Sequence, residues 1–309
     1  MFTRKVPIWQ AIILLVAALI TPPSPSYADT LTQVVAQKHQ VDIALVLAVD
    51  VSSSIDSSER RFQREAYAAA LQDTRVAQMA LGGRSGSVAI AYMEWSGRSY
   101  QRVHVPMRIM SSQKELASFA RAILAIEDDP GDPMYFQATA VGDALLAAEV
   151  AMSELRLSAR DYVIDISGDG VWNDGSAVQS ARAHVLAQGL TVNGLPIELT
   201  ATPQHRQDLT TVERVSRFYA DCVIGGPGSF HLVARGFQDI RETLIMKLML
   251  EMAELPAEQK TRMAAAWNNG PQIATAQIIP AMVLELSPTV SAPEAQPNCE
   301  STGPMVFVP

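Results

Sequence analysis

The sequence is poor in cysteine and in aromatic side chains, and no cluster of basic residues interrupts its acidic balance. Only two of the 309 residues are Cys, and Phe, Trp and Tyr together make up 6%. Lys and Arg total 24 against 32 Asp and Glu, which gives a formal net charge of −8. An acidic chain without a basic cluster argues against nucleic acid and anionic membrane surfaces as partners.

The sequence also lacks an apolar run of the length that a membrane-spanning helix needs. The run at residues 8–20 is 13 residues long, against the roughly 20 of a spanning helix. Arg4 and Lys5 precede this run, and residues 26–28 (Ser-Tyr-Ala) offer a small-x-small cleavage site. This layout predicts a secretory signal peptide over residues 1–28, removed on export to the periplasm or the extracellular space. An uncleaved anchor is the alternative.

The two cysteines match no zinc-binding spacing. Cys222 precedes a Gly-rich turn, and Cys299 lies in a Pro-rich tail. In an oxidising compartment they could pair and pin the tail to the domain, because disulfides persist there. Two unpaired thiols are the alternative, and the sequence leaves this choice open.

Apolar strands alternate with amphipathic helices over residues 40–254. Strands are expected at residues 41–49, 87–95, 102–109, 161–167, 190–199 and 230–233, and helices at 56–81, 112–126, 139–155, 176–188, 210–219 and 237–255. The alternation predicts an α/β fold with a doubly wound, mostly parallel, Rossmann-like sheet and helices on both faces. Pro106 lacks the N–H that a sheet ladder needs, so residues 102–109 are expected to form one antiparallel edge strand.

The composition changes after residue 255. Eight prolines punctuate residues 256–309. This segment is therefore predicted to be a Pro-rich C-terminal extension that is poorly ordered or loosely docked.

Side chains with oxygen ligands stand at the ends of three predicted elements. Asp50, Ser52 and Ser54 follow the first strand, Thr139 begins a helix, and Asp169 follows the strand at residues 161–167. Ligands of such sheets bind beyond the carboxyl ends of the strands, so these five side chains are expected to converge.

The chemistry of these five residues suits a hard divalent cation. Mg²⁺ prefers oxygen ligands in near-octahedral geometry, so the sequence predicts a Mg²⁺ or Mn²⁺ site. The alternative is that Asp50 and Ser52 merely cap the following helix, as Asp and Ser often do. That alternative leaves Thr139 and Asp169 unexplained.

The pattern D-x-S-x-S, then Thr, then Asp-Gly after a later strand resembles the von Willebrand factor A (vWA) domain and its metal-ion-dependent adhesion site (MIDAS). The resemblance covers about residues 40–254. It implies that Ser52 and Ser54 coordinate the metal through their hydroxyls and that Asp50 and Asp169 bind it directly or through water. Thr139 would also coordinate the metal in the ligand-bound form. An Asp or Glu of a partner protein would fill the sixth coordination position of the metal.

A narrower resemblance is carried by residues 192–197 and by residues 222–228 with the long helix that follows. These segments are similar to a bacterial family of exported vWA-like domains, DUF1194, which has no assigned function. The resemblance supports the fold and the metal site and supplies no ligand.

Other polar residues near the predicted site have two interpretations each. Glu94 to Ser96 either rim the metal face or pack at the end of the second strand. Residues 172–174 either form part of the surface that contacts the ligand or have no part in binding. Asp143 lies one helical turn past Thr139 and is expected to face solvent rather than support the site.

We therefore predict an exported binding module that holds a carboxylate-bearing protein partner through its metal. The sequence contains neither a G-x-S-x-G elbow nor an H-E-x-x-H motif, so no catalytic residue is assigned and no enzyme activity is expected. A Mg²⁺-dependent hydrolase or phosphatase is one alternative. Such phosphatases usually carry a second Asp where this chain has Ser52. A structural protein of envelope assembly is the other alternative.

Overall fold

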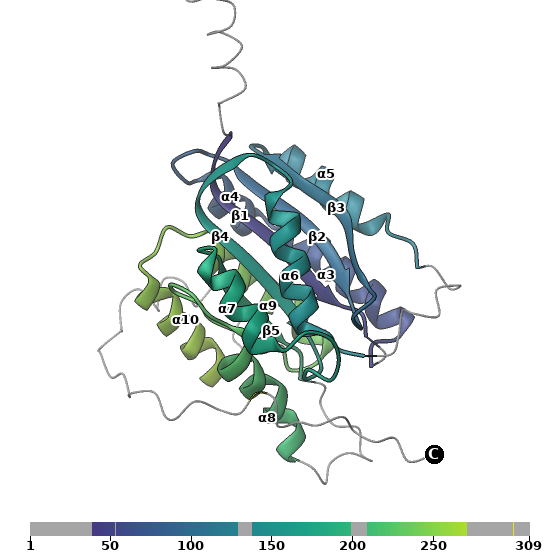
Figure 1. Ribbon diagram of the computed structural model, residues 1–309. Helices are drawn as coiled ribbons and strands as arrows, with labels where there is room; N and C mark the ends of the chain where they lie inside the picture. The colour runs from purple at the N-terminus through teal and green to yellow at the C-terminus, as the bar shows by residue number, and fades with distance from the viewer. Residues whose placement is uncertain (1–38, 53, 129–137, 199–208, 271–298, 300–309) are drawn as a thin grey trace, which may run out of the picture. The chain divides into compact units, whose positions relative to one another are not determined.

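A five-stranded sheet with the order β3-β2-β1-β4-β5 forms the centre of the fold (Figure 1). The computed structural model describes residues 39–52, 54–128, 138–198, 209–270 and 299. The strands are β1 (His39–Asp50), β2 (Val88–Trp95), β3 (Gln101–Met110), β4 (Leu157–Gly168) and β5 (Thr191–Pro196). β1 pairs in parallel with β2 and β4 with β5, whereas β3 runs antiparallel to β2. The predicted fold class, a mostly parallel sheet with one antiparallel edge strand, is confirmed.

Helices cover both faces of this sheet. They are α3 (Ser57–Gln72), α4 (Thr74–Leu81), α5 (Gln113–Leu124), α6 (Val141–Ser153), α7 (Val178–Ala187), α8 (Leu209–Phe218), α9 (Ile240–Met252) and α10 (Ala257–Asn269). A π-helical turn, η1 (Tyr219–Val223), continues α8, and a 3-10 turn, η2 (Phe237–Asp239), precedes α9. One core holds side chains of α3, α4, α5 and α9, and the other holds side chains of α6, α7, α8 and η1.

The central strand β1 supplies both cores because its side chains alternate between the faces. Leu45 and Leu47 belong to the core under α3 and α9, whereas Ala44 and Ala48 belong to the core under α6. A parallel strand covered on both faces is expected to be apolar throughout, as this one is. The small side chains on the α6 face leave room for that helix to pack closely.

The helix predicted over residues 56–81 is two helices, so this prediction was wrong in detail. Asp73 separates them, with the extended dihedral angles φ −65° and ψ 133°. Its side chain accepts the backbone N–H of Arg75 at 2.8 Å and so caps α4. Asp side chains compete in this way with the helical hydrogen bonds of the backbone.

The strand predicted at residues 230–233 is reduced to isolated bridges. His231 bridges Gly194 of β5, and Ala234 bridges Ile197, both in the parallel sense. The segment therefore lies beside β5 and extends its edge irregularly.

Helix α10 lies within the segment assigned to the C-terminal extension, and the sequence pattern does not predict it. Its Met263 and Trp267 are buried against Phe230, Met246 and Leu250. The rest of the extension, apart from residues 256, 270 and 299, and the predicted signal peptide lie outside the described residues. No helix in the described ranges is long and apolar enough to cross a membrane.

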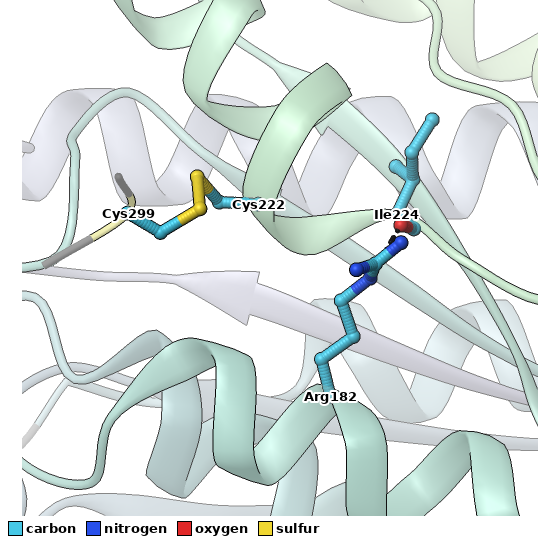
Figure 2. Close-up of a disulfide and its surroundings, with 4 residues drawn as sticks. All are labelled: Arg182, Cys222, Ile224 and Cys299. Atoms are coloured by element: carbon cyan, nitrogen blue, oxygen red, sulfur yellow. Dashed lines mark hydrogen bonds between the residues drawn. A yellow bond between two sulfur atoms is a disulfide. The ribbon is translucent and has the colours of Figure 1, made fainter. Parts of the chain in front are cut away.

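Cys222 and Cys299 form a disulfide bond (Figure 2). The first of the two alternatives for the cysteines is thus confirmed. The bond joins η1 to a residue 77 positions further along the chain.

Candidate metal centre

The D-x-S-x-S loop turns immediately after β1. Asp50 is the last residue of that strand and is fully buried. Its Oδ1 accepts the backbone N–H of Ser52 at 2.8 Å, and the Ile55 N–H donates to the Ser52 carbonyl at 2.9 Å. Ser52 is buried, whereas Ser54 is exposed. The loop thus carries its ligands from the interior of the domain to its surface.

The alternative that Asp50 and Ser52 merely cap the next helix is contradicted. The N-cap of α3 is Asp56, whose side chain accepts the N–H groups of Ser58 and Glu59. Glu59 in return accepts the Asp56 N–H at 2.9 Å, which completes a capping box. Asp50 and Ser52 are therefore not needed to begin the helix.

Asp169 meets the loop from the end of β4. Its Oδ1 accepts the Ser54 hydroxyl at 2.7 Å, and the Ser52 and Ser54 hydroxyl oxygens lie 3.4 Å apart. A continuous series of contacts therefore links Asp50, Ser52, Ser54 and Asp169, although 115 positions separate Ser54 from Asp169.

Thr139 reaches the same region from the start of α6. A Cβ added to Gly170 would lie 3.2 Å from the Thr139 Oγ1, so this hydroxyl faces the residue next to Asp169. The Thr139 N–H donates to the Asn173 Oδ1 at 2.8 Å, and the Asn173 N–H donates to the Thr139 carbonyl at 3.2 Å. The structure thus gathers all five predicted residues at the carboxyl ends of β1 and β4.

The two carboxylates are held in an environment that penalises their negative charge. Burial raises the pKa of Asp50 well above its usual value, and the nearby charge of Asp169 raises it further. Burial also raises the pKa of Asp169. The Oδ2 atoms of both residues are buried without a hydrogen-bond partner in the described part of the chain.

This environment fits a divalent cation. A cation between two carboxylates would offset the cost of their burial and mutual repulsion. The described ranges hold no group of three or more His, Cys, Asp or Glu that could bind a metal ion. The oxygens that lie beside the two carboxylates are those of the Ser52, Ser54 and Thr139 hydroxyls, and hydroxyl oxygen is a ligand type that hard cations accept.

Asp143 is half-buried and bonded to a loop residue instead of facing solvent freely, so that expectation was wrong. Its Oδ2 accepts the Ser176 N–H at 2.8 Å, and its Oδ1 accepts the Ser176 hydroxyl at 2.9 Å. Asp143 lies in the first turn of α6, so it joins the Thr139 segment to the loop after Asp169. At the rim of this loop, Arg98 pairs with Asp174 at 2.7 Å.

Glu94 packs at the end of its strand and is not directed at the metal residues. Its carboxylate accepts two Arg64 donors at 2.7 and 2.8 Å and lies 3.3 Å from His104 Nε2. Burial alone would raise the pKa of Glu94, but Arg64 and His104 hold it at about 2. The backbone carbonyl of Ser96 accepts the Ala140 N–H at 2.9 Å, so Ser96 contacts the residue that precedes α6.

Sequence reasoning missed one residue that holds the loop. Gln63 of α3 is buried and donates its Nε2 hydrogen to the Asp50 carbonyl at 3.3 Å. A glutamine at a position that the helical spacing places on the apolar side is the sequence signal that could have identified it, because a buried amide needs a hydrogen-bond partner.

Comparison with known proteins gives one family. A family model described as "Protein of unknown function (DUF1194)" matches residues 40–256. No match is found among curated proteins.

Solved structures similar to this chain include a thread matrix protein and a pilus adhesin. Proximal thread matrix protein 1 from the mussel byssus has a TM-score of 0.46 and 15% identity over 69% of this chain and 49% of its own. The same protein with a zinc-occupied MIDAS motif gives 0.44 and 17% over 69% and 48%. The pilus adhesin SpaC from Lactobacillus rhamnosus GG gives 0.49 and 12% over 70% and 32%. The chain thus spans half or less of the length of each of these proteins.

Proposed function

Because the chain belongs to the DUF1194 family, whose description names no ligand, we propose from its own residues that it is an exported binding module. In this proposal Asp50, Ser52, Ser54, Thr139 and Asp169 hold a divalent cation through which a protein partner binds. One observation carries the proposal. The fully buried Asp50 and the half-buried Asp169 each have a buried oxygen with no hydrogen-bond partner among the described residues, and both lie beside three hydroxyl groups.

The five side chains would make different contributions to metal binding. Asp50 and Asp169 nearly balance a charge of +2, and the three hydroxyls contribute neutral oxygen ligands. A bound Mg²⁺ or Mn²⁺ would supply an electrophilic position that attracts a carboxylate from outside. Ser54 is exposed and Asp169 is half-buried, so a partner can approach from their side of the site.

One further feature supports an exported protein, and another limits the kind of partner. A Cys222–Cys299 disulfide is stable in the periplasm or outside the cell and rare in a reducing cytosol. The acidic chain has no basic patch for nucleic acid. A partner that offers Asp or Glu to the cation suits a site built from hydroxyls and two carboxylates.

The phosphatase alternative lacks one carboxylate. Where such an enzyme usually places its second Asp, this chain has Ser52, and its hydroxyl oxygen lies 3.4 Å from that of Ser54. An assay of phosphate-ester hydrolysis with Mg²⁺ present separates the two functions. Turnover that depends on Asp50 would favour the enzyme.

The first test of the proposal is metal-dependent stability. Mg²⁺ or Mn²⁺ should raise the melting temperature of the mature protein, because a ligand at a hundredfold excess over its Kd adds about 2.7 kcal/mol to the free energy of unfolding. Asp50→Asn, which preserves side-chain size, should abolish the increase. Asp161→Asn, at a half-exposed position near the start of β4, is the matched control and should retain it. Equal melting curves in metal and in EDTA would count against the site.

The second test concerns the partner. The mature protein is used to capture proteins from an envelope extract, with Mg²⁺ and with EDTA. The proposal expects a protein that is retained by the wild type in Mg²⁺ and released by EDTA. The Asp50→Asn variant should not retain it.

A further inference from the structure

Tyr219 is a fully buried residue whose hydroxyl is not accounted for by the core around it. It begins the π-helical turn η1, and its hydroxyl has no hydrogen-bond partner among the described residues. Leaving a buried hydroxyl unpaired is unfavourable, and π-helical turns occur frequently at functional sites. The unpaired hydroxyl therefore suggests that Tyr219 has a role beyond packing.

Two glycines on neighbouring strands make room for the Tyr219 ring. A Cβ added to Gly194 of β5 would lie 2.7 Å from the Tyr219 Cδ1, and one added to Gly168 of β4 would lie 2.8 Å from the hydroxyl oxygen. Neither is among the described glycines with positive φ. They are therefore required by the close approach of the ring and not by the backbone conformation.

The hydroxyl end of the ring points to the proposed metal site. The same added Cβ on Gly168 would lie 2.7 Å from the Asp50 Oδ2, so Asp50 and Tyr219 both face this glycine. The Oδ2 atom is an acceptor without a donor, and the hydroxyl is a donor without an acceptor, within the described residues. A tyrosine hydroxyl ordinarily holds its proton at neutral pH, so it can act as a donor here.

Two contacts fix the turn that carries Tyr219. Cys222, three residues further along η1, is bonded to Cys299, and the Arg182 Nε–H donates to the Ile224 carbonyl at 2.7 Å. Figure 2 shows both contacts beside the end of this turn. The ring is thus held at a defined place against the ends of β1 and β4.

We propose that Tyr219 is a sixth residue of the metal centre, a positioning residue. Its hydroxyl faces the same point beside Gly168 as Asp50 Oδ2. On cation binding it would donate to that oxygen, a contact that the described residues do not make in this structure, and so orient the carboxylate toward the cation. The inference rests on the proposed function of the site. The backbone N–H of Ser52 already fixes the other oxygen of Asp50. Carboxylates that bind metals are commonly held by such partners, whose loss typically weakens metal affinity 10–100-fold.

The test compares Mn²⁺ binding to three forms of the mature protein by calorimetric titration. Tyr219→Phe removes only the hydroxyl and should weaken Mn²⁺ binding by about tenfold or more, while the metal-free protein melts at the same temperature as the wild type or higher. Tyr92→Phe is the matched control. Its buried hydroxyl donates to Glu94 at 3.1 Å, away from the site, and its loss should leave the Mn²⁺ affinity unchanged.

Each outcome of this experiment has one meaning. Wild-type affinity in Tyr219→Phe overturns the inference and leaves the metal site intact, whereas a wild type that binds no Mn²⁺ overturns both. If Tyr219→Phe fails to fold, the near-ultraviolet absorbance of the wild type decides. Saturating Mn²⁺ should shift a tyrosine band if the hydroxyl faces the site, and an unchanged spectrum overturns the inference.

Discussion

At the scale of single residues, Gly168 is a position where one added methyl group should disturb both Asp50 and Tyr219. Its Cβ would come within 3 Å of both Asp50 Oδ2 and the Tyr219 hydroxyl, a separation at which something must move. Gly168→Ala is expected to lower the free energy of unfolding by about 1–3 kcal/mol, as overpacking does, and to weaken Mn²⁺ binding. Urea denaturation and Mn²⁺ titration measure the two effects.

Gly189→Ala is the control for this substitution. Gly189 has a φ of +83° and no atom within 4 Å of an added Cβ, so the change strains the backbone without touching the site. It should lower stability and leave the Mn²⁺ affinity as in the wild type. If both variants bind Mn²⁺ equally well, Gly168 has no special relation to the centre.

The convergence of the five proposed metal ligands could be predicted because a local pattern places each of them at the end of a strand or the start of a helix. Tyr219 could not, because its position depends on a π-helical turn and on space left by glycines in two other strands. Asp143 was misjudged for a related reason. Helical spacing says which residues share a face, but not that a loop 33 positions away supplies Ser176 as a partner.

At the scale of elements, helix α9 is joined to the sheet by buried charges. Lys247 of α9 lies 2.7 Å from Asp165 of β4 and 2.5 Å from Glu251, and all three side chains are fully buried. Asn193 of β5 donates to Glu251 at 3.1 Å. Burial and the charge of Glu251 raise the pKa of Asp165 to about 7, although Lys247 acts in the opposite direction.

This arrangement gives a pH-dependent prediction for Lys247→Met. The variant leaves two buried carboxylates without a cation, which should cost about 3–5 kcal/mol at pH 8. The loss should be smaller at pH 5, because Asp165, with a raised pKa in the folded state, takes up a proton and stabilises the folded form as the pH falls below about 7. Urea denaturation at both pH values checks this.

Lys114→Met on α5 is the matched control, because Lys114 is exposed. Its free energy of unfolding should change by less than about 0.5 kcal/mol at either pH. An equal loss at pH 5 and pH 8 for Lys247→Met would show that the carboxylates do not respond to protons as argued.

Some elements followed from the sequence and others did not. Pro106 correctly indicated the edge position of β3, because a proline cannot donate to a ladder. The break between α3 and α4 was missed, since apolar spacing continues across Asp73 while its side chain caps the second helix. Helix α10 was missed because few apolar residues, Met263 and Trp267 among them, mark its buried side within a proline-rich segment.

At the scale of the whole molecule, removal of the disulfide should lower the free energy of unfolding of the domain. Cys222–Cys299 closes a long loop, with a sequence separation of 77, and a native disulfide typically contributes about 2–4 kcal/mol. The double variant Cys222→Ser, Cys299→Ser should lose about that much. Because η1 carries Tyr219, its Mn²⁺ affinity should also fall, though less than in Tyr219→Phe.

Thermal denaturation with and without a reductant measures this contribution. Reductant should lower the melting temperature of the wild type to that of the double variant and have no effect on the variant itself. A wild type that melts at the same temperature in reductant would show that the bond does not stabilise the fold.

The covalent link also determines where a mechanical load would act. Tension applied to the polypeptide beyond Cys299 would be delivered at Cys222, next to the turn that carries Tyr219. Helices α9 and α10 lie between the two cysteines along the chain and would be shielded from the pull. The load would then act first at η1, which lies beside the Asp50 end of β1 and the proposed metal site.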